Sequence, residues 1–155
     1  MRLVIQCVNR ASVRVQEEET GAERETGRIG RGYVVLLGVA DGDTKEIADR
    51  FLDKLYKLRV FPDANGKTNC SIQDIGGEVM VVSQFTLYAD CRKGNRPSFT
   101  GAGSPALAEE LYEYFKEGVR SRFGSVQSGE FGAHMRVDLE NDGPFTLMWD
   151  SEDWK

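Results

Sequence analysis

Few of the side chains that usually carry out hydrolysis occur in this sequence of 155 residues. His134 is the only histidine, so a Ser-His-Asp triad or a histidine-based metal site would have to include it. The GxSxG motif that presents the nucleophile of many serine hydrolases is missing. His134 also falls among alternating polar and apolar residues, on the polar positions, which indicates a solvated side chain. A catalytic triad and a metallohydrolase are therefore disfavoured, and no metal site is predicted.

The cysteine and glycine patterns give no sign of a bound cofactor. Cys7, Cys70 and Cys91 are odd in number, widely spaced and without a CxxC pair, which favours reduced thiols over disulfides or a zinc site. The glycines of residues 30–32 precede a strand pattern, whereas a dinucleotide-binding loop would open a helix. No cofactor is predicted.

The charge and hydropathy of the chain limit its partners. Its net charge is −5 and its pI is about 5.0, whereas a protein that binds nucleic acid mainly through phosphates is usually basic. An RNA partner would therefore be held at a local basic patch or only at its end. No stretch approaches the roughly 18 apolar residues of a membrane span, and no apolar leader follows Met1. We expect a cytoplasmic protein without membrane contact.

The elements that must position any site follow from the apolar patterning. Short-period runs rich in valine, isoleucine and leucine predict strands over residues 3–8, 11–15, 33–39, 59–61, 78–85, 135–140 and 145–149. The charged residues 16–28 are predicted to form an exposed hairpin connection. Two helices are expected, one beginning near Asp43 or Thr44 and one at Ser104-Pro105, each with an apolar stripe at helical spacing.

Two helices cannot cover both faces of a sheet with this many strands, which disfavours a doubly wound fold. We therefore predict one α/β domain over residues 1–155. Its expected architecture is a three-layer sheet-sheet-helix arrangement with a mixed or antiparallel sheet and two main helices. Sheet surface left uncovered by the helices could be buried by a second copy, so a homodimer is expected.

Two polar segments stand out against this framework. Ser83-Gln84-Phe85-Thr86-Leu87 places polar groups where an apolar strand runs out. Asn141-Asp142-Gly143-Pro144-Phe145-Thr146 interrupts an alternating strand, because proline cannot donate a ladder hydrogen bond. Both segments resemble the defining motifs of the D-aminoacyl-tRNA deacylase family, SQFTL and NxGPxT. The resemblance extends in order and spacing over nearly the whole chain, through residues 4–6, 10–13, 36–39, 42–44, 58–61, 77–78, 88–90, 92–94, 96–99 and 131–133.

The resemblance implies a homodimeric enzyme that hydrolyses the ester between a D-amino acid and the terminal adenosine of tRNA. It implies that glycine attached to a non-cognate tRNA is also accepted. It further implies that Gly143 and Pro144 form a cis peptide that one subunit inserts into the active site of the other, where it holds the substrate ammonium and blocks an L side chain. Rejection by a backbone clash depends on no side-chain rotamer. Phe131, Met135 and Asn141 are expected to complete the substrate site.

The expected catalytic residues are Ser83, Gln84, Phe85 and Thr86. Amides around Phe85 and Thr86 could stabilise the oxyanion, an effect worth about 3–4 kcal/mol per donor in other enzymes. Thr86 is a candidate nucleophile by position, but the sequence offers no base to activate it. We favour catalysis assisted by the 2′-hydroxyl of the terminal adenosine, with Thr86 positioning groups through hydrogen bonds.

Two further positions bear on the substrate. Arg92, Lys93 and Arg96 form the best basic patch, for which contact with acceptor-end phosphates and a solvated loop are both open interpretations. Cys7 departs from the family pattern, which usually has arginine after Gln6. That arginine is thought to hold the Gly-Pro motif, so Cys7 bears on how strictly L substrates are rejected.

The alternative from another functional class is a non-catalytic module that binds nucleic-acid ends, or a replication-associated DNA-binding protein. The negative net charge counts against it. Release of free amino acid from D-Tyr-tRNA, with L-Tyr-tRNA as the control, would separate the two hypotheses.

Overall fold

The computed structural model describes all residues from 1 to 155. Its elements, in chain order, are β1 (Arg2–Gln16), β2 (Glu23–Ile29), β3 (Gly32–Gly38), α1 (Lys45–Lys57), β4 (Arg59–Pro62), β5 (Thr68–Ser71), β6 (Glu78–Ser83), the 3-10 helix η1 (Phe85–Tyr88), α2 (Pro105–Phe123), β7 (Gln127–Ser128), β8 (Met135–Asp150) and the 3-10 helix η2 (Ser151–Trp154). The two predicted helix starts are confirmed, because the hydroxyls of Thr44 and Ser104 accept hydrogen bonds from N–H groups in the first turns.

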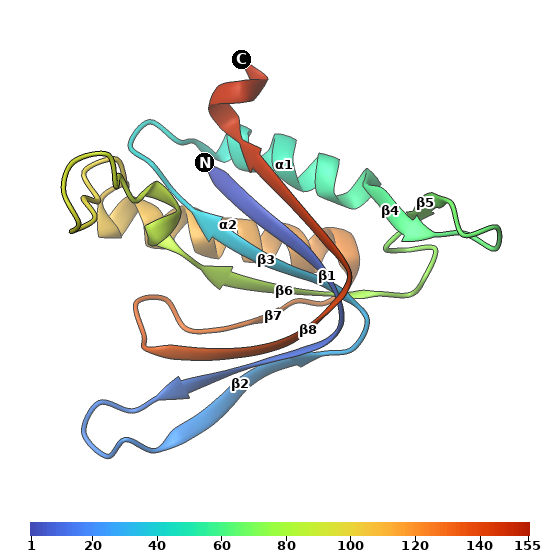
Figure 1. Ribbon diagram of the computed structural model, residues 1–155, viewed down its shortest axis with the longest axis horizontal. Coiled ribbons are helices and arrows are strands. Elements are labelled where there is room, and N and C mark those ends of the chain that lie inside the picture. Colours follow the sequence, from blue (N-terminus) through green and yellow to red (C-terminus); the bar gives the residue numbers. More distant parts are fainter.

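Six of the eight strands form one mixed sheet (Figure 1). The strand order is β2-β1-β3-β6-β7, and β8 pairs with the other edge of β1. All pairs are antiparallel except β3 with β6 and β6 with β7. Parallel pairs need a long crossover, which α1 and the β4–β5 hairpin supply for the first pair and α2 for the second.

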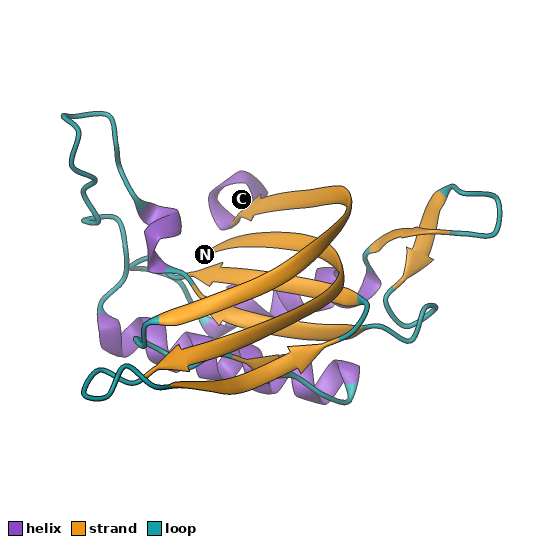
Figure 2. Cartoon of the chain, turned by 60° about the horizontal axis from the view of Figure 1, so that its bottom comes forward, coloured by secondary structure: helices purple, strands orange, loops and turns teal.

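The sheet curls because β1 changes partners along its length (Figure 2). Its first half pairs with β3 and its second half with β2, while β8 follows it throughout. The curl brings β2 alongside β7 and encloses an apolar interior. The buried side chains of this interior are Val8, Ala11, Val13, Ile29, Val34, Met80 and Val82. The two predicted sheet layers are thus opposite sides of one curled sheet and not two stacked sheets.

Both α-helices pack on the outer face of the sheet and form the larger core. Phe51 and Leu55 of α1 and Leu111, Phe115 and Val119 of α2 are almost completely buried there. Each such side chain contributes about 1.5–3 kcal/mol through removal of apolar surface from water. The prediction of two main helices with apolar stripes is confirmed. Neither helix is long and apolar enough to cross a membrane.

Three local predictions need correction. Residues 16–28 contain most of strand β2. The side chains in the first half of this strand are exposed and can therefore be charged, while backbone pairing with β1 holds the strand in place. Residues 3–8 and 11–15 belong to the single strand β1, which continues through a β-bulge at Asn9. The predicted strand over residues 78–85 ends at Ser83, because the chain tightens into η1 at Phe85.

Candidate active site

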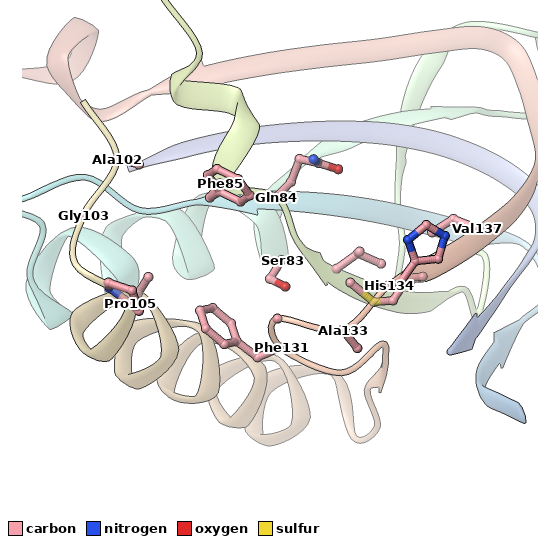
Figure 3. A pocket seen from close by; sticks show the side chains of 14 residues that line it. Ser83, Gln84, Phe85, Ala102, Gly103, Pro105, Phe131, Ala133, His134 and Val137 are labelled. Atoms are coloured by element: carbon pink, nitrogen blue, oxygen red, sulfur yellow. The ribbon is translucent and has the colours of Figure 1, made fainter. Parts of the chain in front are cut away.

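A pocket of about 520 Å³ opens where β6 ends. Its walls come from the end of β6, the start of η1, the loop before α2 with the first turn of that helix, and the segment that leads into β8. Figure 3 shows Phe85 and Phe131 on different sides of this pocket, with Ser83 between them. The predicted residues Ser83, Gln84, Phe85, Phe131 and Met135 therefore meet in one place although they come from distant parts of the sequence.

Close contact with the end of β3 fixes the turn that follows β6. The backbone N–H of Gln84 donates to the carbonyl of Leu37 at 2.8 Å. Next to it, Gly38 leaves the space into which η1 packs. A Cβ atom at Gly38 would lie 3.0 Å from the Gln84 carbonyl oxygen and 3.1 Å from the Cβ of Leu87. A larger residue at position 38 would therefore push the turn away from the sheet.

The pocket contains one titratable side chain, that of His134, which is exposed at the pocket wall. No carboxylate lines it, and the chain nowhere groups three or more histidine, cysteine, aspartate or glutamate side chains as a metal site would require. Polar groups that can act on a substrate are the hydroxyl of Ser83, the amide of Gln84, the imidazole of His134 and the backbone. The pocket is thus built to bind and polarise, with no carboxylate base of its own.

Thr86 lies beside the pocket and does not line it. Its side chain is exposed, and its Oγ1 accepts a hydrogen bond from the side-chain amide of Gln84. An amide N–H donates and cannot take a proton from the hydroxyl, so this contact supplies no general base. The hydrogen bonds inside η1 join the Leu87 N–H to the Gln84 carbonyl and the Ala89 N–H to the Thr86 carbonyl, which leaves the N–H groups of Phe85 and Thr86 without a partner in the turn.

The second polar segment forms a wide bulge in the middle of β8. Gln6 of β1 pairs with Thr146 and Val8 pairs with Asn141, so residues 142–145 stand opposite the single residue Cys7. The Gly143–Pro144 peptide bond is cis, as the resemblance implies, and Gly143 has a φ of 122°. Residues 141–144 are all exposed, and none of them lines the pocket of its own chain. Within one chain, Asn141, Gly143 and Pro144 therefore do not join the other predicted site residues.

Cys7 lies beneath this bulge and is almost completely buried. Its neighbour on β3 is Tyr33, whose buried hydroxyl has no hydrogen-bond partner. Burial, followed by the charge of Asp142, raises the pKa of the Cys7 thiol to about 11, while Arg31 acts in the opposite direction. The thiol is protonated and therefore neutral at neutral pH, so position 7 offers the bulge neither a negative charge nor the positive charge of an arginine.

The basic loop runs between η1 and α2, and its residues 91–100 are exposed. Arg92 bonds both carboxylate oxygens of Asp90, at 2.8 and 2.7 Å. This guanidinium, with the Arg92 backbone N–H, holds the pKa of Asp90 well below its usual range. Arg92 is thus already neutralised within the loop, whereas neither Lys93 nor Arg96 forms an ion pair. Of the three predicted tRNA contacts, these two remain free for an anionic partner.

Comparison with known proteins assigns the family. Residues 4–150 match the family described as D-Tyr-tRNA(Tyr) deacylase. The chain belongs to the D-Tyr-tRNA deacylase family. Relatives named D-aminoacyl-tRNA deacylase include those of Syntrophomonas wolfei, 51% identical over 98% of both chains, and Thermosipho melanesiensis, 48% identical over 98% of both. The relative from Bifidobacterium adolescentis is 49% identical over 99% of this chain and 98% of its own.

Two solved structures share the fold of this deacylase-family chain. A c-Myc DNA unwinding element binding protein superposes with a TM-score of 0.85 at 40% sequence identity, over 97% of this chain and 98% of its own. A probable eukaryotic D-amino acid tRNA deacylase superposes with a TM-score of 0.82 over 96% and 97% of the two chains. The latter is 20% identical and therefore supports the fold alone.

Sequence reasoning missed most of the pocket wall, which is largely made of small or apolar residues, and it placed His134 in solvent without assigning it to a site. The additional lining residues are Val82, Ala102, Gly103, Pro105, Ala108, Gly132, Ala133, His134 and Val137. Small apolar residues carry no chemical signature, and they become walls only when the loop before α2 approaches the end of β6. The alanine and glycine residues directly before the Ser104-Pro105 helix start were the available signal, because a chain segment without large side chains leaves space beside it.

Proposed function

We propose that this protein hydrolyses the ester bond of D-aminoacyl-tRNA, and of glycyl-tRNA formed on a non-cognate tRNA, to free amino acid and tRNA. The reaction needs no cofactor or metal in this proposal. The protein acts in the cytoplasm as a homodimer, and its nucleic-acid partner is the aminoacylated 3′ end of tRNA. Family membership and the names of the relatives support the reaction class.

The observation that carries the proposal is the composition of the pocket at the SQFTL motif. It has room for a small substrate group, it is mainly apolar, and it holds no carboxylate. A group that such a pocket can accept is the aminoacyl-adenosine end of the tRNA, with the negatively charged remainder kept outside. A net charge of −5 is compatible with binding of this kind, because few phosphates need to be contacted.

In the proposed reaction the 2′-hydroxyl of the terminal adenosine helps to activate a water molecule. The water oxygen adds to the ester carbonyl carbon, and the N–H groups of Phe85 and Thr86 stabilise the developing oxyanion. The bond between this carbon and the 3′-oxygen then breaks, and the proton lost by the water passes through the 2′-hydroxyl to the departing 3′-oxygen, which leaves as a free hydroxyl. Thr86 and Gln84 form a hydrogen-bonded pair that positions these groups and needs no nucleophilic role.

Selection against L substrates is assigned to the Gly143–Pro144 segment of a second copy. The segment is exposed and separate from the pocket of its own chain, which supports a role across a subunit interface. Its carbonyls would receive the substrate ammonium and occupy the position of an L side chain. A D side chain and the hydrogen of glycine both avoid this clash.

The decisive experiment measures release of free amino acid from D-Tyr-tRNA, L-Tyr-tRNA and glycyl-tRNA by the purified protein. The proposal expects rapid release from the first and third substrates and none above background from the second. Equal release from both tyrosyl substrates would overturn the chirality mechanism. No release from any of them, with tRNA-end binding retained, would favour the non-catalytic module, the alternative suggested by the name of the DNA unwinding element binding protein.

A further inference from the structure

Arg2, the first residue of β1, reaches the catalytic turn from outside the pocket. Its Nη1 donates to the carbonyl of Leu87 at 2.8 Å, and its guanidinium carbon lies 4.4 Å from the centre of the Tyr88 ring. Its Nε donates to Asp150 at 2.6 Å, so the last residue of β8 provides a third contact to the guanidinium. One planar cation therefore joins the last two residues of η1 to two strands of the sheet.

This arrangement meets a need of the turn itself. η1 is only four residues long, and no side chain caps its start. Its internal hydrogen bonds use the carbonyls of Gln84 and Thr86, so neither uses the Leu87 carbonyl. Upstream the turn is fixed by the bond from Gln84 to Leu37, but downstream it runs into the exposed loop of residues 91–100. Arg2 supplies the fixed point on the downstream side.

The strand register explains why this residue can reach the turn. Arg2 pairs with Gly38 on β3 and with Asp150 on β8. Gly38 has no side chain, so the path from Arg2 to Leu87 and Tyr88 stays open. Asp150 orients the guanidinium, and its hydrogen bond is the main cause of the raised pKa of Arg2. The contact thus depends on both neighbours of Arg2 in the sheet.

We propose that Arg2 is a positioning residue for deacylation, which holds η1 so that the N–H groups of Phe85 and Thr86 point at the substrate carbonyl. It touches no substrate and acts only through the turn. The inference rests on the proposed function for its kinetic consequence, while the tie between Arg2 and η1 can be measured independently. Because Asp150 belongs to the strand that carries Gly143 and Pro144, the same contact links the two motif-bearing segments of one chain.

The test compares Arg2→Met with Arg2→Lys and with a matched control, Arg50→Met. Arg50 also donates to a backbone carbonyl at 2.8 Å, that of Trp154 in η2, and it does not contact η1. Single-turnover deacylation of D-Tyr-tRNA gives the rate at saturation and the half-saturating concentration separately. Amide hydrogen exchange of residues 85–89, compared with the core strand β3, reports the order of the turn.

We expect Arg2→Met to lower the saturated rate about tenfold or more, since charge-assisted hydrogen bonds to fixed partners are among the stronger ones. The half-saturating concentration should stay nearly constant, exchange should accelerate at residues 85–89 alone, and Arg2→Lys should recover part of the rate. An unchanged rate in a folded Arg2→Met protein would overturn the proposal, as would an equal loss in Arg50→Met. If no variant or wild type releases amino acid, the proposed function fails, and the exchange data still decide whether Arg2 orders the turn.

Discussion

The two motif segments differ in how completely their own chain supports them. The turn after Ser83 is tied to β3 by a backbone hydrogen bond from Gln84 to Leu37, packed against Gly38 and contacted by Arg2. The bulge around Gly143 and Pro144 projects from β8 with its residues exposed and without a place in the pocket. The first segment is positioned by contacts within one chain, whereas the second is exposed and lies apart from the pocket of that chain. The proposed chemistry and the proposed selection can therefore be perturbed separately.

The largest expected effect separates the chemistry of the turn from that of the RNA. A D-aminoacyl-tRNA whose terminal adenosine lacks the 2′-hydroxyl should lose at least about 10²-fold in rate, as expected for loss of a proton-transferring group. Thr86→Ala should keep much of the wild-type rate, because Thr86 lies outside the pocket and has no base. Single-turnover release of D-tyrosine measures both. An inactive Thr86→Ala protein with normal folding and tRNA binding would restore threonine as the nucleophile.

The next effect concerns the bulge. Gly143→Ala places a Cβ atom on a residue with φ of 122° and 3.0 Å from the Phe145 nitrogen, so the bulge must change shape at a cost of about 1–2 kcal/mol. The ratio of D-Tyr-tRNA to L-Tyr-tRNA hydrolysis should fall about tenfold or more, since about 1.4 kcal/mol corresponds to a factor of ten. Gly42→Ala is the matched control, because Gly42 has a φ of 90° with open space around it.

A mixing experiment tests whether the bulge acts across subunits. Ala133→Trp would fill the pocket from the loop that leads into β8, and Gly143→Ala would disable the bulge. In a mixed dimer, the Gly143→Ala subunit has an open pocket, and the Ala133→Trp subunit supplies an intact bulge to it. Recovery of D-selective hydrolysis on mixing supports action in trans. Mixed dimers that stay as unselective as Gly143→Ala alone would place the bulge's action within one chain.

A smaller effect is expected at the basic loop. Lys93→Gln with Arg96→Gln should weaken tRNA binding and reduce the salt dependence of the affinity, by about one unit of slope for each phosphate that the variant no longer neutralises. Arg92→Gln should change the slope less, because Asp90 already compensates that guanidinium. Binding titrations at several salt concentrations distinguish them. A larger effect of Arg92→Gln than of the double variant would contradict this assignment.

The smallest expected effect is a change in the pKa of Cys7, which tests whether Asp142 of the bulge lies close to Cys7 of the same chain. Burial, and after it the charge of Asp142, raises the pKa of Cys7 to about 11, so the folded state favours the neutral thiol. Its contribution to the free energy of unfolding is complete below the ordinary thiol pKa of about 8.5 and is lost as pH rises towards 11. Asp142→Asn should shift thiolate formation at Cys7 to lower pH. The pH dependence of the alkylation rate of Cys7 measures this shift. Asp138→Asn is the control, and an identical shift in both variants would show that Asp142 does not lie against Cys7.

Much of the framework could be predicted because its signals are local. Thr44 and Ser104 mark helix starts through their own hydroxyls, and the stripes on α1 and α2 follow from helical spacing. Strand β2 could not be predicted in this way, since its charged residues have no apolar alternation and only pairing with β1 holds them. The curl of the sheet escaped prediction for a related reason, because it arises from a change of partner within β1.

The sequence by itself determined the two motifs, the two helices, most strands and the resemblance to the deacylase family, because each depends on residue types a few positions apart. Tertiary structure alone decided that Ser83, Phe85 and Phe131 share a pocket, that Thr86 lies beside it, and that the Gly143–Pro144 bulge stands opposite Cys7. These relations join segments far apart in the chain through strand register and packing. A difference of one residue in that register would place every later side chain of a strand on the other face, and no local pattern contains that information.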